Sequence, residues 1–435
     1  MTHAANHMDA GSRSGHWVLR IPLEAIVRLS LFLLISVSGM VMVEPAPYDL
    51  MVLGLVGLYA FAGLELRRSH TPLLLLLGMW ITGGMLTITV SGDLGVATRY
   101  IAISTFLVLS AFLYAALLTK DLNRMKTLER AYIFAGVLSA CAGIVGYLDL
   151  LPNAYELFTR YGRAKAAFKD PNVYGPFLLL PALFLTYDIL TKPLKTSLFR
   201  LALLMVLVLG IFLSFSRAAW GMLVLSGGLV FLLVFINEPR KGRRTRMLGL
   251  LGLVFIAAVL LFAIALSIDE IANMFFERAK LVHSYDSARV GRFARHILGF
   301  EMVTERPLGL GIGAFTDYFP EEEHNVYLKG FTTYGWLGGF AYVTLIGITL
   351  WKATALIFQP RPYQKYVVCF YAAFLVHVLV GLIIDTNHWR HFFLLLGGMW
   401  SLIATEAALK AAWRFPLGSH GGKSSVLIKS REAGN

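Results

Sequence analysis

Residues 247–268 read MLGLLGLVFIAAVLLFAIALSI, and none of these 22 side chains carries a charge. An α-helix rises about 1.5 Å per residue, so a run of this length spans the roughly 30 Å hydrocarbon core of a bilayer. The run follows directly on RKGRRTR at residues 240–246, which holds five basic side chains. Basic residues concentrate at the cytoplasmic ends of membrane helices. The segment therefore predicts a transmembrane helix that enters the membrane from the cytoplasm.

Similar apolar runs recur along the chain and predict an all-α polytopic membrane protein. We expect about twelve transmembrane helices, at roughly residues 24–43, 48–66, 71–91, 97–119, 131–149, 172–190, 200–215, 218–236, 247–268, 335–356, 366–385 and 392–411. Every second connection is basic, which places both termini in the cytoplasm by the positive-inside rule. The first twenty residues lack the pattern of a cleavable signal peptide, so the first helix is expected to remain as an anchor. The whole chain, residues 1–435, is predicted to be a single transmembrane domain.

The composition supports this interpretation and excludes others. Hydrophobic residues make up 57% of the 435-residue chain and charged residues only 15%, whereas soluble domains carry about 25% charged residues. The net charge of +13 resides mostly in short connections between apolar runs, so it reflects membrane topology rather than nucleic-acid binding. Cys141 and Cys369 both lie inside apolar runs, which indicates neither a disulfide framework nor a zinc site.

Two of the predicted outer connections are long, residues 150–171 and residues 269–334. The second is too long and too polar to be a simple connector, and loops of this length are usually functional. Within it, residues 287–304 place apolar side chains on one face of a helix and basic side chains on another. We therefore expect a large helical loop between the ninth and tenth transmembrane helices.

These outer segments are also basic. The first long loop contains Arg160, Arg163 and Lys169, and the second contains Arg289. Arg217 stands alone between two apolar spans, at the outer end of the seventh. Lipid headgroups or acidic side chains would account for single loop arginines, and long loops cross the membrane regardless of their charge. Several guanidinium groups converging at this depth, however, suit a phosphate or diphosphate, because Arg donates two parallel hydrogen bonds to it.

A histidine stands shortly before the tenth predicted span, in PEEEHN at residues 320–325. Proline followed by acidic residues is typical of the first turn of a helix, so we expect His324 to lie in such a turn at the outer rim. The adjacent glutamates are expected to raise its basicity. His324 is thus a candidate general base for deprotonating a hydroxyl. A hydrogen-bonded surface histidine is the alternative.

The sequence around this histidine resembles a known signature. HN at residues 324–325, followed after nine residues by GWLG at 335–338, resembles the H-[NSQ]-x9-G-x-x-G signature of O-antigen ligases, which form a superfamily with the O-antigen polymerases. Three further motifs resemble parts of this family in the same order: DPN at 170–172 before a span, SR at 216–217 at a helix end, and Arg289 followed by PLGLG at 307–311. The resemblance covers roughly residues 160–340.

The resemblance implies a fold similar to the GT-C membrane glycosyltransferases. It also implies transfer of a glycan from undecaprenyl diphosphate to a sugar hydroxyl of the lipid A core, on the periplasmic face of the bacterial inner membrane. In that case Arg217 and Arg289 hold the diphosphate and His324 deprotonates the acceptor. Substrate binding is further expected from Arg160, Arg163, Lys169, Asn172, Asn325 and Arg390.

The sequence contains no Asp-x-Asp motif of the kind that metal-using GT-C enzymes show. Arginine can neutralise a leaving diphosphate, so we expect catalysis without a metal or another cofactor. The expected partners are the lipid-linked donor, the lipid A-core acceptor and membrane lipids, but no nucleic acid. An O-antigen polymerase and a protein O-oligosaccharyltransferase are alternatives within the superfamily. A glycan transporter is disfavoured, because no two-fold repeat is evident and few ionisable residues lie in mid-span.

Overall fold

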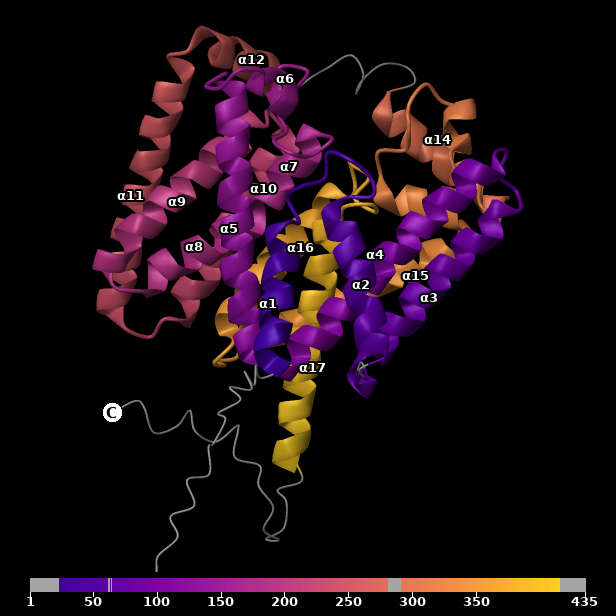
Figure 1. Ribbon diagram of the computed structural model, residues 1–435, viewed down its shortest axis with the longest axis horizontal. Coiled ribbons are helices and arrows are strands. Elements are labelled where there is room, and N and C mark those ends of the chain that lie inside the picture. The colour runs from indigo at the N-terminus through magenta and orange to yellow at the C-terminus, as the bar shows by residue number, and fades with distance from the viewer. Residues whose placement is uncertain (1–22, 62, 64, 281–290, 415–435) are drawn as a thin grey trace, which may run out of the picture.

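The computed structural model describes residues 23–61, 63, 65–280 and 291–414 of the chain, and this part is almost entirely helical (Figure 1). The long helices are α1 (Leu23–Ser36), α2 (Pro47–Phe61), α3 (Thr71–Ile88), α4 (Leu94–Lys120), α5 (Leu122–Tyr147), α7 (Pro171–Phe177) with α8 (Leu179–Thr191), α9 (Leu194–Leu213), α10 (Arg217–Asn237), α11 (Lys241–Leu266), α15 (Val326–Ile357), α16 (Gln364–Val380) and α17 (Arg390–Arg414). Between them lie η1 (Arg68–His70), α6 (Ala154–Phe158), the strands β1 (Thr159–Arg160) and β2 (Arg163–Ala164), α12 (Asp269–Ala279), α14 (Arg292–Thr304) and η2 (Ala314–Asp317). The prediction of an all-α architecture is confirmed.

Eight helical stretches within the described residues are long and apolar enough to cross a membrane: Arg68–Ile88, Leu94–Lys120, Leu122–Tyr147, Pro171–Thr191, Arg217–Asn237, Lys241–Leu266, Val326–Ile357 and Arg390–Ala411. The chain is therefore a multi-pass membrane protein. Each of the twelve predicted segments overlaps a helix, but α1, α2, α16 and the apolar part of α9 are shorter. The count of twelve crossings stays a prediction.

The sixth predicted span is divided into α7 and α8 at Leu178. Pro176 lies inside α7 and Pro181 lies in the first turn of α8, and neither proline has a backbone N–H to donate along the helix. The start of α7 follows directly from the sequence. The Asp170 carboxylate accepts a hydrogen bond from the Asn172 N–H at 2.6 Å, and proline occupies the first helical position, an arrangement typical of a helix start.

The tenth predicted span begins earlier than expected, at Val326 rather than near residue 335. The expectation of a helical turn at residues 320–324 is wrong, because Asn325 is the residue that caps the helix. Its side-chain oxygen accepts hydrogen bonds from the N–H groups of Tyr327 and Leu328 at 3.0 and 3.1 Å. His324 therefore lies in the irregular segment before the helix, not inside its first turn.

Gly335 interrupts α15 at the residue where the predicted span starts. Its φ of 63° and ψ of −174° are not helical, and a Cβ atom at this position would lie 2.7 Å from the carbonyl oxygen of Pro307. That oxygen accepts a hydrogen bond from the Trp336 N–H at 2.8 Å. The outer-loop segment around residues 307–311 thus packs into the break, which only glycine permits.

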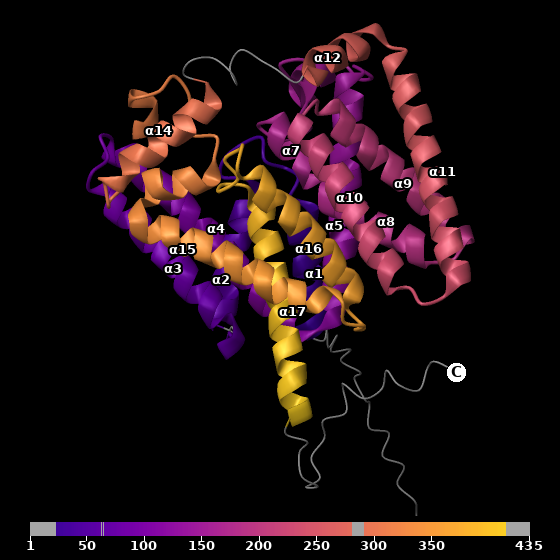
Figure 2. The ribbon, with the colours of Figure 1, turned by 180° about the vertical axis from the view of Figure 1, so that it is seen from behind.

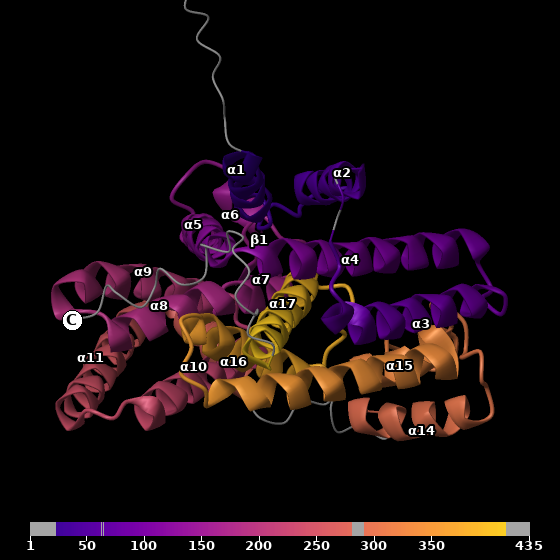
Figure 3. The same ribbon diagram turned by 90° about the horizontal axis from the view of Figure 1, so that it is seen from below.

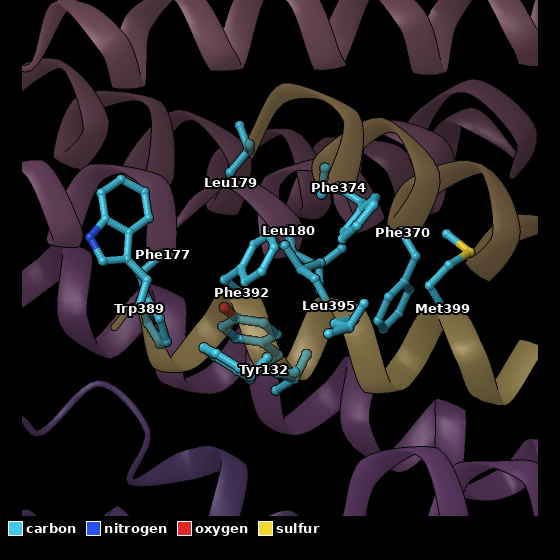
Figure 4. Close-up of a cluster of buried hydrophobic side chains, with 14 of the residues drawn as sticks. Tyr132, Phe177, Leu179, Leu180, Phe370, Phe374, Trp389, Phe392, Leu395 and Met399 are labelled. Carbon is cyan, nitrogen blue, oxygen red and sulfur yellow. The ribbon is translucent and has the colours of Figure 1, made fainter. Parts of the chain in front are cut away.

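Helices distant in sequence form the core. α3 packs along α15 and α4 along α17 (Figure 3). Buried side chains from α5, α7, α8, α16 and α17 fill the centre, including Tyr132, Phe177, Leu180, Phe374 and Phe392 (Figure 4). The segments α6 and α12 lie beside α7 at one end of the molecule, and α14 lies at the same end but apart from them (Figures 1 and 2). The long loop expected between residues 269 and 334 therefore does contain helices, and the two long outer loops meet at the same end.

Candidate functional site

A cavity of about 770 Å³ opens at this end of the molecule. Its lining comes from both long loops, the start of α10 and the connection between α16 and α17: Arg163, Asp170, Asn172, Val173, Phe215, Ser216, Arg217, Ala218, Arg278, Arg292, Phe293, Glu321, His324, Ile383, Ile384, Asp385 and Trp389. Four of the predicted site residues meet here, namely Arg163, Asn172, Arg217 and His324. Arg289 lies outside the described residues.

Arg163 is buried and joins the first outer loop to the turn before α10. Its Nε donates to the Ser214 carbonyl at 2.8 Å, and its Nη2 donates to the Asn172 side-chain oxygen at 2.8 Å. The antiparallel pair β1–β2 carries Arg163 opposite Arg160. Arg160 itself is exposed and donates to the Lys169 carbonyl at 2.9 Å. It does not line this cavity. Asn172 thus orients an arginine at the wall of the cavity.

Arg217 occupies the first position of α10, where the helix dipole is positive. Ser216 caps the helix, and its Oγ accepts from the Ala219 N–H at 3.4 Å. The guanidinium reaches across to α12, where Nη1 donates to the Lys280 carbonyl at 3.1 Å. A helix start that carries an arginine is well suited to bind an anion.

Arg278, on α12, also lines this cavity, and its Nε is buried without a hydrogen-bond partner among the described residues. A buried donor without a partner is costly, so a bound anion would stabilise it. Arg292, at the start of α14, completes the arginine lining. Each of the three carboxylates of the lining has a partner within the protein. Asp170 caps α7, Glu321 pairs with Arg295 at 2.5 Å, and Asp385 contacts Lys329 at 3.2 Å.

His324 adopts a left-handed backbone conformation with a φ of 47°, which is uncommon for any residue other than glycine. Its side chain is 40% exposed, and its Nδ1 lies 3.8 Å from an Asp385 carboxylate oxygen. The other Asp385 oxygen accepts a hydrogen bond from the Asn325 N–H at 3.0 Å. Asp385 therefore holds the backbone beside His324 and faces its imidazole at the same time.

The polar face of α14 fixes the segment that carries His324. Arg295 and His296 are both buried. The Arg295 guanidinium pairs with Glu321, and the His296 Nε2 donates to the Glu323 carbonyl at 2.8 Å. Burial lowers the pKa of His296, which favours the neutral ring that makes this bond. Two anchors in a segment of only three residues hold the backbone just before His324.

The glutamates before His324 are directed toward basic groups of their own. Glu322 and Glu323 both pair with the Lys329 ammonium, which also contacts Asp385. Burial raises the pKa of the Glu323 carboxyl. The carboxylate that lies within 4 Å of the His324 ring in the described part of the chain is thus Asp385 and not a sequence neighbour.

The same three carboxylates are the group in the described residues that resembles a metal site. Oxygen atoms of Glu322, Glu323 and Asp385 lie within 4.8 Å of one another. The Lys329 ammonium contacts all three, so it takes the position of a counter-ion and neutralises part of their charge. The donor set alone would suit a divalent cation, but with the lysine present it does not fit one.

A second, smaller cavity of about 320 Å³ adjoins the first. The two share Val173, Asp385 and Trp389. Lys169 and Arg390, both predicted to bind substrate, line the smaller cavity. The Lys169 ammonium pairs with Glu44 at 2.7 Å, and Arg390 makes two 2.7 Å contacts with Asp49. These two basic residues lie apart from the arginines of the larger cavity.

A comparison with models of protein families finds a match in the region that carries this cavity. A model of the O-antigen ligase family matches residues 201–343, which include Arg217, α12, α14 and His324. This match supports a place for the chain in the O-antigen ligase superfamily. No curated protein matches the chain. The match supports a glycan-transferring membrane enzyme of the ligase and polymerase type, a family that implies lipid-linked glycan and lipid A-core substrates.

Sequence reasoning missed several residues of the candidate site. Asp385 was placed at the end of the eleventh predicted span, yet α16 ends at Val380 and Asp385 lies in the connection that follows. A charged residue at the end of an apolar run was a usable signal. Lys329 was assigned to the outer loop, and Arg278 could not be distinguished from other loop arginines. Their importance depends on contacts between segments far apart in sequence.

Proposed function

We propose that this enzyme transfers a glycan from undecaprenyl diphosphate to a sugar hydroxyl of the lipid A core. The observation that carries the proposal is the larger cavity, where Arg163, Arg217, Arg278 and Arg292 face the same space as His324. Guanidinium groups bind diphosphate oxygens in pairs of hydrogen bonds. An imidazole that reaches the same space is positioned to accept a proton from an incoming hydroxyl.

In this reaction the His324 imidazole takes the proton of the acceptor hydroxyl as its oxygen attacks the anomeric carbon of the donor glycan. The bond between that carbon and the diphosphate oxygen breaks, and its electron pair leaves with the diphosphate. Asp385, 3.8 Å from Nδ1, stabilises the positive charge that forms on the ring. The arginines neutralise the negative charge that forms on the leaving group. Arg289 is proposed to share this role.

Catalysis is proposed to need no metal ion. The arginines of the larger cavity supply positive charge where the leaving group collects electrons. The acidic cluster beside His324 already surrounds the Lys329 ammonium. The active end is assigned to the periplasmic face of the inner membrane and both termini to the cytoplasm. The basic connections at every second loop support this orientation.

The test is ligation by the purified His324→Ala variant with an undecaprenyl diphosphate-linked glycan and lipid A-core. Loss of a general base lowers the rate by about 10²–10⁴-fold. Glu305→Ala serves as the control, because Glu305 is exposed on the same loop and lines neither cavity. Normal ligation by His324→Ala would overturn the general-base assignment. Elongation of the lipid-linked glycan in the absence of lipid A-core would identify a polymerase instead.

A further inference from the structure

The smaller cavity shares Asp385 with the larger one and differs from it in chemistry. Its volume of about 320 Å³ is at the lower end of the range for small-molecule sites. Aromatic side chains from five separate segments form much of the wall: Tyr48, Tyr100, Tyr132, Phe168, Phe177 and Trp389. Aromatic rings with polar groups between them are suited to pack against the C–H faces of a ring that carries several hydroxyl groups.

The charges in this wall are balanced internally. Lys169 pairs with Glu44, and Arg390 pairs with Asp49 and lies 3.5 Å from Glu44. Burial lowers the pKa of His388 to about 3, so this ring is neutral at physiological pH. A diphosphate would have to break existing ion pairs to bind here. An uncharged polyhydroxyl group would not.

One histidine of the wall has a ring nitrogen without a hydrogen-bond partner among the described residues. His391 lines the smaller cavity and is 95% buried, and its Nε2 has no hydrogen-bond partner in the described structure. A buried polar atom without a partner costs about 1–3 kcal/mol. The His391 ring lies in the cavity wall, so a ligand hydroxyl that reached this nitrogen would remove this cost, and this is the second observation that indicates a polar ligand.

The two cavities meet beside His324, the proposed general base. They share Val173, Asp385 and Trp389, and His324 lines only the larger one, next to Asp385. In a single displacement, the attacking oxygen and the leaving oxygen lie on opposite sides of the reacting carbon. A ligand seated in the smaller cavity lies apart from the arginines of the larger one, as an attacking group must lie apart from the leaving diphosphate.

We propose that the smaller cavity binds the sugar ring of the acceptor, and that His391 positions it by hydrogen bonding. This inference rests on the proposed function, because it assigns one of the two substrates of that reaction to a place. The first sugar of the donor has the same chemistry, so the experiment must separate the two substrates.

The test compares purified full-length His391→Phe with wild type, varying the acceptor at saturating donor and then the donor at saturating acceptor. Phenylalanine keeps the ring contacts with Phe177 and His377 but removes the nitrogen. The acceptor KM should rise about 3–10-fold, the loss expected for one hydrogen bond, while the donor KM stays unchanged. His377→Phe is the matched control. His377 is 99% buried beside His391 and also has an unpartnered Nε2, but it lines neither cavity.

An unchanged acceptor KM in folded His391→Phe would overturn the proposal, and so would a rise in the donor KM. If His391→Phe does not fold, Tyr100→Phe replaces it. This change removes a hydroxyl of the same cavity, which accepts from the Asn387 amide at 2.7 Å. Binding of lipid-free core oligosaccharide to the same proteins is measured separately by calorimetry. If wild type transfers no glycan but binds this oligosaccharide more tightly than His391→Phe, the proposed function fails while the sugar site stands.

Discussion

The two neighbouring cavities contain basic residues of the same kind, but these residues have different surroundings. In the smaller cavity, Arg390 is held by two 2.7 Å contacts with Asp49. In the larger cavity, Arg217 stands at a helix start and donates to the Lys280 carbonyl. An arginine near a substrate path is therefore not by itself an anion site. An arginine that already holds a carboxylate, as Arg390 does, would have to release it in order to bind a diphosphate.

Replacing Lys329 should produce the largest effect, because this residue supports the wall between the cavities. Lys329→Ala leaves the carboxylates of Glu322, Glu323 and Asp385 close together without their shared ammonium. Breaking a buried ion pair from one side costs about 3–5 kcal/mol. We expect a clear fall in the unfolding temperature in detergent. Lys120→Ala, which removes an exposed pair with Glu65, should change stability by less than about 1 kcal/mol. Equal stability of the two variants would contradict the described role of Lys329.

Arg390→Ala should have an intermediate effect, on stability rather than on donor binding. It removes the two contacts with Asp49 that link the start of α17 to α2. Hydrogen bonds to a charged group contribute about 1.5–3 kcal/mol. Thermal unfolding measures this loss, and the donor KM should stay within about twofold of wild type. A large rise in the donor KM would place Arg390 in the diphosphate site and remove the distinction between the cavities.

Chelation should have the smallest effect. Dialysis of the purified protein against excess chelator is expected to leave the ligation rate unchanged, because arginines neutralise the leaving group and Lys329 occupies the acidic cluster. Atomic absorption of the dialysed sample provides the control for complete metal removal. A loss of activity that Mg²⁺ or Mn²⁺ restores would show that the cationic cavity is insufficient.

The sequence predicts the helices well because insertion of a helix into a membrane depends on the apolar composition of that segment alone. The run at residues 247–268 needs no partner to be apolar, and α11 (Lys241–Leu266) covers nearly all of it. The errors occur where backbone details override composition. Asn325 starts α15 before the apolar run begins, and Gly335 breaks it where the run starts.

The site is predicted only in part, because residue type is local whereas pairing is not. Arg163, Asn172, Arg217 and His324 were expected together and share one cavity. Lys169 and Arg390 were expected with them, but each pairs with a carboxylate of the segment at residues 44–49. That segment lies more than 100 residues away from either of them in sequence, and nothing in the local pattern indicates the contact.

The most direct test of the central claim is binding of undecaprenyl diphosphate without a glycan to wild type, Arg217→Ala, Arg217→Lys and His391→Phe. Loss of a charged hydrogen bond to the diphosphate, about 1.5–3 kcal/mol, should weaken binding to Arg217→Ala by about 10–150-fold. Lysine should restore only part of the affinity, because it cannot make the paired contact. His391→Phe should bind as wild type does. If Arg217→Ala binds normally, or His391→Phe weakens binding as much, the larger cavity is not the diphosphate site.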